Sequence, residues 1–562
     1  MKNLRILFLT FTAVFVFSLA GSAQDQAQND FEISKNIDIF VSLYKQLNNS
    51  YVDDLNPGQL IKTAMDAMLK TLDPYTVYIP EADIEDYKFM TTGQYGGIGA
   101  LIHKRGEYVF ISEPYENAPA DKAGLKAGDK ILEINGKSAK DKTVDEVSTA
   151  LKGQPGTSVS LLLERDSTQK PIQKEIIREE IKIDNVPYSG MVADDIGYIN
   201  LSEFKQNAAK DVKDAFNKLN GDKKLKGVII DLRGNGGGLL NESVNIVNIF
   251  VDKGQLVVST KGKIKDKNTY HKTQMAAMDT EIPLVILVDE NSASASEILA
   301  GAIQDLDRGV IIGQRSFGKG LVQNIFPLSY NSEVKITIAK YYTPSGRCVQ
   351  ALDYFHKDEY GKAPVLPDSL RKAFTTKNGR VVYEGSGIEP DIIMELPEFS
   401  NITVALLDKN YFFDFSVLYN RKTPAIAPVD QFKITEDIYN EFLEYLKGKD
   451  YTYTTESEAV LEDLKKAAET EKYFNAIKEN YNVLKEKILK EKDNDLAANK
   501  DQIKQILKMY LVPFYYYQKG RIQSSLADDP EVLKAVEILH NNEVYTSILK
   551  GTYCEPENKN KK

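Results

Sequence analysis

Residues 284–297 of the chain read LVILVDENSASASE. The first five are apolar, as in a strand buried on both faces, and the small residues that follow the acidic pair are typical of a turn that begins a helix. The stretch therefore predicts a strand, a turn and a helix, with Ser294 exposed in the turn. A serine there gains from the positive end of the helix dipole, which favours negative charge developing beside it. The alternative is that the three serines only cap the helix.

Strand and helix patterns alternate around this stretch. We expect strands at 197–201, 227–232, 283–289 and 310–313, and helices at 209–219, 239–250 and 295–304. Such alternation predicts an α/β core.

A second segment, residues 313–323, reads GQRSFGKGLVQ and follows the apolar strand expected at 310–313. Its lysine, Lys319, lies between two glycines. A Gly-Lys-Gly sequence is usually an exposed turn, but glycines also allow a lysine to enter a crowded site. Desolvation there would lower the pKa of Lys319, so that its neutral amine can act as a base.

The rest of the composition argues against several other kinds of site. The four histidines all lie outside both segments, so a Ser-His-Asp triad has few candidates, and a lysine base is a known substitute. We find no His/Cys cluster with metal-ligand spacing and expect neither a metal nor an organic cofactor. The 71 basic and 81 acidic residues give a net charge of −10, which argues against a general nucleic-acid binder.

A third segment, residues 228–240, reads VIIDLRGNGGGLL and predicts a strand, a glycine-rich turn and a helix. It lacks the Lys-Ser/Thr pair of a phosphate loop, and Leu239 stands where a dinucleotide fingerprint needs its third glycine. Its backbone amides suit an oxyanion hole, which stabilises the tetrahedral intermediate formed when a serine attacks a peptide carbonyl.

From Gly96 to about Arg165 the pattern changes to short strands with glycine turns. Residues 94–102 read QYGGIGALI, and successive amides around glycines can grip a carboxylate, with Gly97, Ile98 and Gly99 as the candidate contacts. The rest of a bound peptide would add a strand to a sheet edge. We therefore expect a PDZ-like module that captures a free peptide C-terminus; a glycine-rich β domain without a ligand is the alternative.

The first residues of the chain have the pattern of a targeting segment. Residues 1–5 carry positive charge and 6–20 form a nearly uninterrupted apolar run, which predicts a secretory signal peptide ending near Ala23. An uncleaved anchor is the alternative, although a bilayer span needs about 20 apolar residues.

The chain has only two cysteines, Cys348 and Cys554, which excludes a framework of several disulfides. One bridge between them and two free thiols both stay open.

Amphipathic helical patterns flank the strand-rich middle, with Pro57-Gly58 as the break between two N-terminal helices and a charged, separate appendage beyond Pro428. We expect a signal peptide at 1–23, an N-terminal helical region at 30–90, the PDZ domain at 91–168, the catalytic core at 175–396, a C-terminal helical domain at 428–552 and a disordered tail at 553–562.

Taken together, these segments resemble the C-terminal processing peptidases, also called tail-specific proteases, over about residues 30–396. The resemblance rests on SASASE at 292–297, FGKG at 317–320 with a glutamine four residues after its lysine, and DLRGNGGG at 231–238. YGGIG at 95–99 and GLKAGD at 124–129 match signatures of the family's PDZ domain.

The resemblance implies roles for individual residues. Ser294 would be the nucleophile, Lys319 the general base and Gln323 the residue that orients the lysine. Glu297 lies where the family places a carboxylate near the active site. The implied oxyanion-hole donors are the amides of Ala295 and Gly238, with Gly237 as the alternative.

The resemblance also implies an α/β multidomain fold: a crotonase-like protease core with an inserted PDZ domain, an N-terminal helical region and a C-terminal helical appendage. It implies an exported, periplasmic serine endopeptidase, soluble or membrane-associated, that acts on proteins or peptides with free apolar C-termini, with an adaptor or a homo-oligomer as further partners. Two rivals remain, a catalytically silent PDZ adaptor and a crotonase-like acyl-transfer enzyme.

Overall fold

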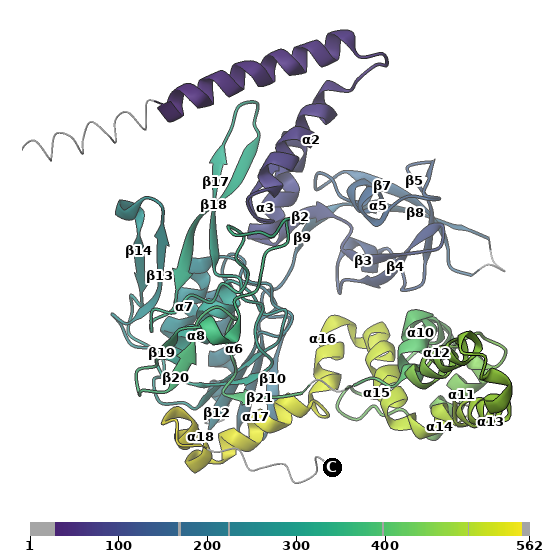
Figure 1. The fold of residues 1–562 in the computed structure, drawn as a ribbon. Coiled ribbons are helices and arrows are strands. Elements are labelled where there is room, and N and C mark those ends of the chain that lie inside the picture. The colour runs from purple at the N-terminus through teal and green to yellow at the C-terminus, as the bar shows by residue number, and fades with distance from the viewer. Residues whose placement is uncertain (1–27, 167–169, 223–224, 396–397, 493, 554–562) are drawn as a thin grey trace, which may run out of the picture. The chain divides into compact units, whose positions relative to one another are not determined.

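The computed structural model describes residues 28–166, 170–222, 225–395, 398–492 and 494–553 (Figure 1). The expected signal peptide, Cys554 and the tail beyond it lie outside these residues. The described residues divide into two compact units, with the boundary between Tyr78 and Ile79. None of the described helices is long and apolar enough to cross a membrane.

The first unit is helical over residues 28–50 and again in α2 (Pro57–Lys70). The Asn56 side chain accepts a hydrogen bond from the Gln59 amide and caps α2, and Pro57 stands in its first turn. Proline suits that position because the first amides of a helix have no helical partner to lose. The expected break at Pro57-Gly58 is thus also the start of the second helix.

The second unit contains a six-stranded core sheet. The strands lie in the order β10 (Tyr188–Ala193), β11 (Ile196–Asn200), β12 (Gly227–Asp231), β15 (Leu284–Val288), β16 (Val310–Gly313) and β21 (Ile392–Ile393). The β10–β11 pair is antiparallel and every later pair is parallel. The strands expected from the sequence are confirmed to within about two residues.

One face of this sheet is covered by helices that connect its successive parallel strands, namely α6 (Ala208–Asp222), α7 (Leu240–Phe250) and α8 (Ala295–Asp305). Side chains alternate along a strand, so Ile230 and Ile286 pack under these helices while Ile229 and Leu287 point to the opposite face. Both sets are buried, which explains the continuous apolar runs.

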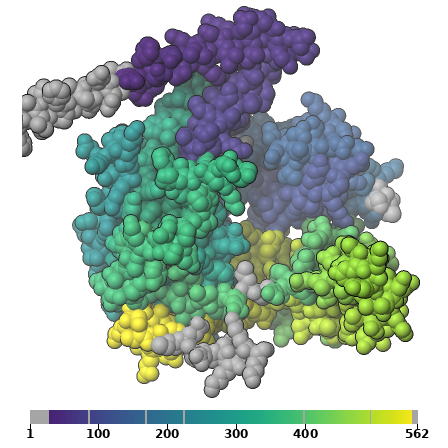
Figure 2. Space-filling view, in the orientation of Figure 1, coloured from purple at the N-terminus to yellow at the C-terminus, as the bar shows by residue number. Residues whose placement is uncertain are grey.

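The opposite face is covered by the last two helices, α17 (Pro530–His540) and α18 (Asn542–Leu549). Val532, Ile538 and Tyr545 share one buried apolar cluster with Ile229 and Leu287 of the strands. Figure 1 shows α17 and α18, at the yellow end of the colour range, beside core strands such as β12, and the same yellow layer lies against the core in Figure 2. The sequence suggested a separate appendage, but its last two helices form a layer of the core.

Beside the core sheet lies an antiparallel ladder of β14 (Thr269–Lys272), β13 (Leu256–Gly262), β18 (Glu333–Tyr342) and β17 (Leu321–Pro327). The β17 strand continues the Lys319 segment and pairs with β18 in a long hairpin. A smaller hairpin joins β19 (Ala373–Thr375) to β20 (Val381–Tyr383). This ladder brings strand side chains next to the turn that holds Ser294.

The β-rich module has its own sheet. Its strands lie in the order β3 (Ala100–Arg105), β4 (Tyr108–Pro114), β5 (Lys130–Ile134), β7 (Ser158–Glu164) and β8 (Ile172–Ile177), with β6 (Lys137–Ser138) paired to β5. The helices α4 (Pro119–Lys122) and α5 (Val144–Leu151) complete it. The entry strand β2 (Gln94–Gly97) pairs with the exit strand β9 (Glu179–Lys182), so the module is an insertion. Its sheet runs through β8, past the expected boundary at 168.

The remaining elements are β1 (Val77–Ile79), α3 (Ile84–Thr92), α9 (Asn401–Asp408), α10 (Tyr411–Lys422), α11 (Glu436–Leu446), α12 (Glu456–Thr470), α13 (Phe474–Lys492), α14 (Asp495–Ala498), α15 (Lys500–Leu511) and α16 (Pro513–Leu526). Helices α9, α10, α11 and α15 bury one apolar cluster of their own. The helical region therefore begins at α9, earlier than the Pro428 expected from the charge pattern.

Candidate active site

Ser294 lies between β15 and α8, at the N-cap position of the helix, with φ 57° and ψ −110°. A non-glycine residue with such dihedral angles is strained by roughly 1–3 kcal/mol and needs partners that hold it. Those partners are present: its amide donates to the Glu297 carboxylate at 2.8 Å, and its carbonyl accepts from the Tyr341 hydroxyl at 3.1 Å. The residue is thus fixed in a sharp turn at the start of the helix.

Glu297 is the hub that joins the serine turn to the lysine segment. Its Oε2 accepts the amides of both Ser294 and Lys319, at 2.8 and 2.9 Å. Its Oε1 accepts the Ser316 hydroxyl and the Gly318 amide, each at 2.7 Å. The two segments that the sequence singled out are therefore held against a single carboxylate.

The Glu297 carboxylate is fully buried. Burial raises its pKa above the usual value, while the hydrogen bonds from Ser316, Ser294, Lys319 and Gly318 act in the opposite direction. A buried carboxylate with this many donors organises its surroundings because each donor would otherwise lack a partner.

The glycine turn after β12 also reaches the serine. A Cβ atom on Gly237 would lie 2.8 Å from the Ser294 Cβ and 2.9 Å from the Ala295 amide nitrogen, and the φ of Gly237 is +100°. Only glycine permits that approach. Fully buried Asn235 ties the two turns together, since its carbonyl accepts the Ala293 amide and the Ser296 hydroxyl.

The backbone amides around Ser294 differ in whether they already donate a hydrogen bond within the protein. The Gly237 amide donates to the Asn235 side chain at 2.9 Å. Within the described residues, the amides of Gly238 and Ala295 donate no hydrogen bond. This difference favours Gly238 and Ala295 over Gly237 as donors to an oxyanion, because a donor must be available when negative charge develops.

Lys319 is half-buried and stands directly before β17. Its flanking glycines have a steric reason: a Cβ on Gly318 would lie 2.5 Å from the Ala351 Cβ, and one on Gly320 would lie 2.8 Å from the Gln350 amide nitrogen. The glycines thus let the lysine backbone pass between Glu297 and the 350–351 segment.

Gln323 lies on β17, next to an irregularity in its pairing with β18. Its side-chain amide donates to the Thr337 hydroxyl across that ladder at 3.2 Å. The contact fixes the glutamine on the strand that continues from the lysine, and its orienting effect on Lys319 stays a prediction.

The predicted carboxylate loop of the β-rich module precedes β3. Gly97 ends β2, Ile98 is buried, and Gly99 has φ +70° with Ala118 too close for a Cβ. Of the strands that the structure describes in this sheet, β3 is at the edge and pairs only with β4, and α5 contacts it. A loop that leads into an edge strand beside a helix is an arrangement that can accept a peptide as an added strand.

Two residues of the site escaped the sequence reasoning. The sequence did not single out Tyr341, and it placed Asn235 only in the glycine-rich turn at 228–240. Their contacts with Ser294, Ala293 and Ser296 join segments far apart in the chain, so no local pattern could reveal them. Among the described residues, no group of His, Cys, Asp and Glu side chains could hold a metal ion.

The fold and the site are those of a serine-type hydrolytic enzyme whose core of helices and strands carries an inserted β-rich module. Its features are a strained serine at a helix start, a glycine turn with available amides, and a lysine segment fixed to the same carboxylate.

Comparisons with known proteins identify the parts. Residues 195–354 match Peptidase family S41, residues 110–165 match a PDZ domain, and residues 402–539 match the C-terminal helical domain of a probable PDZ-protease. A carboxy-terminal-processing protease of Bartonella bacilliformis is 35% identical over 353 residues, which cover 62% of this chain and 80% of that protein.

Two further proteins are similar to this chain. A probable CtpA-like serine protease of Staphylococcus aureus is 33% identical over 371 residues, covering 66% of this chain and 67% of that protein. Among solved structures, a photosystem II D1 C-terminal processing protease is 26% identical and covers 63% of this chain and 92% of that one, with a TM-score of 0.34. The chain belongs to the C-terminal processing peptidases of family S41, serine-type proteases with a PDZ domain.

Proposed function

We propose that the protein is an endopeptidase that cleaves by means of Ser294 and Lys319 and captures the C-terminus of its substrate with the PDZ domain. The observation that carries the proposal is the position of Glu297, whose Oε2 accepts the amides of both residues. It supports the pairing because two segments separated by 25 positions in the sequence share one acceptor atom.

In the first half of the reaction the Ser294 Oγ attacks the carbonyl carbon of the scissile peptide bond, and the neutral Lys319 amine takes the hydroxyl proton. Negative charge on the carbonyl oxygen is stabilised by the amides of Gly238 and Ala295 and by the start of α8. The tetrahedral intermediate collapses when Lys319 returns the proton to the leaving amine. The products are an acyl-enzyme and a new peptide N-terminus.

In the second half, water attacks the acyl carbon while Lys319 again accepts a proton. The second tetrahedral intermediate expels the Ser294 oxygen, which regains its proton from the lysine. Gln323 would orient the lysine through both halves. Both halves use only groups of this chain and water.

The PDZ domain supplies selection before chemistry. The loop of Gly97, Ile98 and Gly99 would bind the terminal carboxylate, and the following residues of the substrate would pair with the free edge of β3. Apolar substrate tails fit this proposal because Leu101, an apolar residue on β3, is 44% exposed. An upstream bond would then be held for Ser294.

Residues 1–23 would direct export, with the mature protein acting in the periplasm. N-terminal sequencing of protein recovered from the periplasmic fraction tests this directly. A mature chain beginning after about residue 23 is expected, whereas an intact Met1 in that fraction would contradict cleavage.

The catalytic assignment is tested with a peptide that has an apolar free C-terminus, assayed by mass spectrometry. Ser294→Ala and Lys319→Ala should each abolish cleavage, while the matched surface variants Ser329→Ala and Lys272→Ala should cleave normally. Undiminished turnover in either active-site variant would refute the pair. Amidation of the peptide's C-terminus should weaken binding to the Ser294→Ala protein if the PDZ loop reads the carboxylate.

A further inference from the structure

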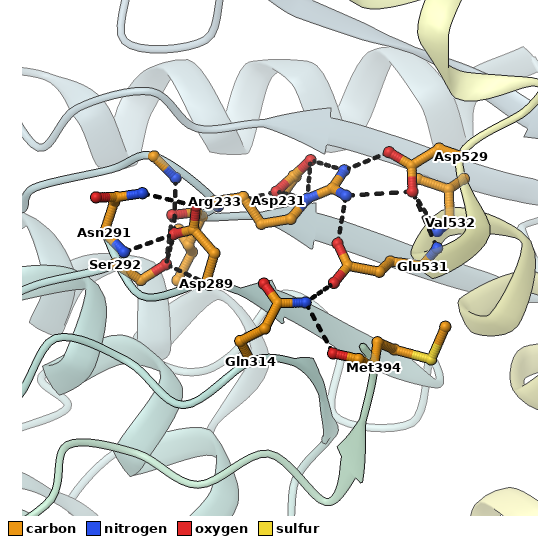
Figure 3. A network of polar contacts seen from close by, with 12 residues as sticks. Asp231, Arg233, Asp289, Asn291, Ser292, Gln314, Met394, Asp529, Glu531 and Val532 are labelled. Atoms are coloured by element: carbon orange, nitrogen blue, oxygen red, sulfur yellow. Dashed lines mark hydrogen bonds and ion pairs between the residues drawn. The ribbon is translucent and has the colours of Figure 1, made fainter. Parts of the chain in front are cut away.

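Arg233 lies inside the glycine-rich turn yet does not face the reaction site. Its guanidinium contacts the Asp231 carboxylate at 2.6 Å, and it also pairs with Asp529 at 2.9 Å and with Glu531 at 2.5 Å. The last two residues begin α17, almost 300 positions later. Figure 3 shows Arg233 between Asp231 and these two carboxylates.

Glu531 holds a second partner besides Arg233. Its Oε2 accepts the guanidinium, and its Oε1 accepts the side-chain amide of Gln314, which also donates to the Met394 carbonyl at 3.1 Å. The Glu531 residue is only 6% exposed. One carboxylate of the C-terminal helix therefore bridges the glycine turn and the lysine segment (Figure 3).

The first turn of α17 is fixed by the same group of residues. Asp529 caps the helix by accepting the amides of Glu531 and Val532, at 3.0 and 3.1 Å, while it also pairs with Arg233. Asp231 also accepts a hydrogen bond from the Tyr198 hydroxyl at 2.6 Å. The position of Glu531 relative to β12 is thus defined by ion pairs and a helix cap together.

Both partners of Glu531 stand close in sequence to groups of the proposed reaction. Arg233 precedes Gly238 by five residues, and Gln314 precedes Lys319 by five. The Gly234 amide, next to Arg233, donates to Asp289 at 2.9 Å, in the loop that leads to Ser294. If Arg233 or Gln314 moved, the short glycine turn or lysine segment that contains it would move with it, because hydrogen bonds hold these loops.

Charge explains why the bridge depends on ionised groups. A single guanidinium faces three carboxylates, so each carboxylate is held by attraction to Arg233 and repelled by the other two. The pKa of Glu531 lies above its usual value because burial raises it more than the nearby Arg233 and Gln314 lower it. An uncharged side chain at position 531 would keep the volume but lose the charge-assisted bond to Arg233.

We propose that Glu531 is a positioning residue for the proteolytic reaction, acting through Arg233 on the oxyanion turn and through Gln314 on the lysine segment. The proposal rests on the Ser294–Lys319 assignment above. It gives the last helices of the chain a part in catalysis beyond covering the sheet.

The test uses the full chain with Glu531→Gln and the peptide assay described above. The kcat should fall about 10-fold, because small displacements of positioned groups cost rate steeply, while KM stays within about two-fold. Gln314→Met removes only the bond between position 314 and Glu531 and should reproduce the loss of kcat. It keeps the proposal testable if Glu531→Gln does not fold.

Two controls on α17 separate positioning from stability. Glu537→Gln makes the same chemical change at a carboxylate 67% exposed and paired to Lys534, and should leave kcat unchanged. Ile538→Ala removes a buried apolar contact of the helix and should lower the melting temperature while leaving kcat at 25 °C unchanged.

The possible results are distinguishable. Wild-type kcat in both Glu531→Gln and Gln314→Met would overturn the inference, and so would an equal kcat loss in Ile538→Ala at a matched melting temperature. If the wild-type chain fails to cleave, or Ser294→Ala still cleaves, the proposed function itself falls. If cleavage needs Ser294 but ignores position 531, only the positioning role is wrong.

Discussion

The two faces of the core sheet are covered by helices that differ in their distance from the strands along the chain. Helices α6, α7 and α8 connect neighbouring strands and pack on the face that holds Ile230 and Ile286. Helices α17 and α18 come from the end of the chain and pack on the face that holds Ile229 and Leu287. The difference shows that the same strand can be buried on one face by helices adjacent to it in the sequence and on the other face by helices from the end of the chain.

The two faces also contribute differently to the site. On the local face, α8 brings Glu297 beside the serine at its own N-terminus. On the distant face, α17 brings Glu531 to the turns behind the site. Both helices begin near the carboxyl ends of the parallel strands, the edge at which α/β sheets place their functional loops.

The largest expected effect comes from cutting the ionic connection of the distant face. Arg233→Met leaves three carboxylates without their cation and should cost about 3–5 kcal/mol of stability at pH 8, measured by urea denaturation. The control Arg315→Met removes a surface ion pair with Glu389, in which the arginine side chain is 47% exposed. It should cost less than about 1 kcal/mol of stability.

The same variant has a defined pH dependence. Without Arg233, burial and mutual repulsion raise the folded-state pKa of Glu531 further above its unfolded value. The folded variant then binds more protons than the unfolded chain, so its stability falls as pH rises through that interval. The deficit relative to wild type should therefore be smaller at pH 5 than at pH 8, and a deficit that grows on acidification would contradict the charge argument.

Adjacent strand residues test whether the faces are independent. Ile286→Ala and Leu287→Ala each remove a fully buried side chain and should each cost about 2–5 kcal/mol. Hydrogen–deuterium exchange should separate them, with faster exchange in α7 and α8 for the first variant and in α17 and α18 for the second. Identical exchange patterns would mean that the two layers open as one unit.

On the local face, Glu297→Gln replaces one acceptor oxygen of the carboxylate by a donor that faces existing donors. The loss of stability should be about 2 kcal/mol, because at least one buried donor is left without a partner. Peptide cleavage should fall with it, since the serine and lysine segments share that carboxylate. The control Glu290→Gln, exposed in the same turn, should match the wild type in both urea denaturation and turnover.

The smallest effect is expected at the distant face. The Tyr545 hydroxyl accepts the Leu284 amide at 2.9 Å, at the start of β15. Tyr545→Phe should cost about 1 kcal/mol in urea denaturation and leave turnover unchanged. The exposed control Tyr270→Phe should cost nothing measurable, and a large loss of turnover in Tyr545→Phe would show that α18 also reaches the site.

Local chemistry in the sequence accounts for much of the core and for several site candidates. The apolar runs and glycine turns around β12, β15 and β16 predicted each of these strands and the helices that follow β12 and β15, because periodicity and turn residues act over a few positions. The same reasoning missed the cover provided by α17, since its amphipathic pattern suits any apolar surface. It also ended the PDZ sheet before β8, because a surface strand after a loop has a weak signal.

The sequence by itself determined which segments are the candidates for catalysis: the serine turn at 289–297, the glycine turn at 231–238 and the Gly-Lys-Gly segment at 318–320. Only the tertiary structure decided how they meet, on the buried Glu297 carboxylate and beside Tyr341. The physical reason is range. Backbone propensity and turn chemistry are set by neighbours in the chain, whereas burial, ion pairs and shared acceptors arise only when distant segments are packed together.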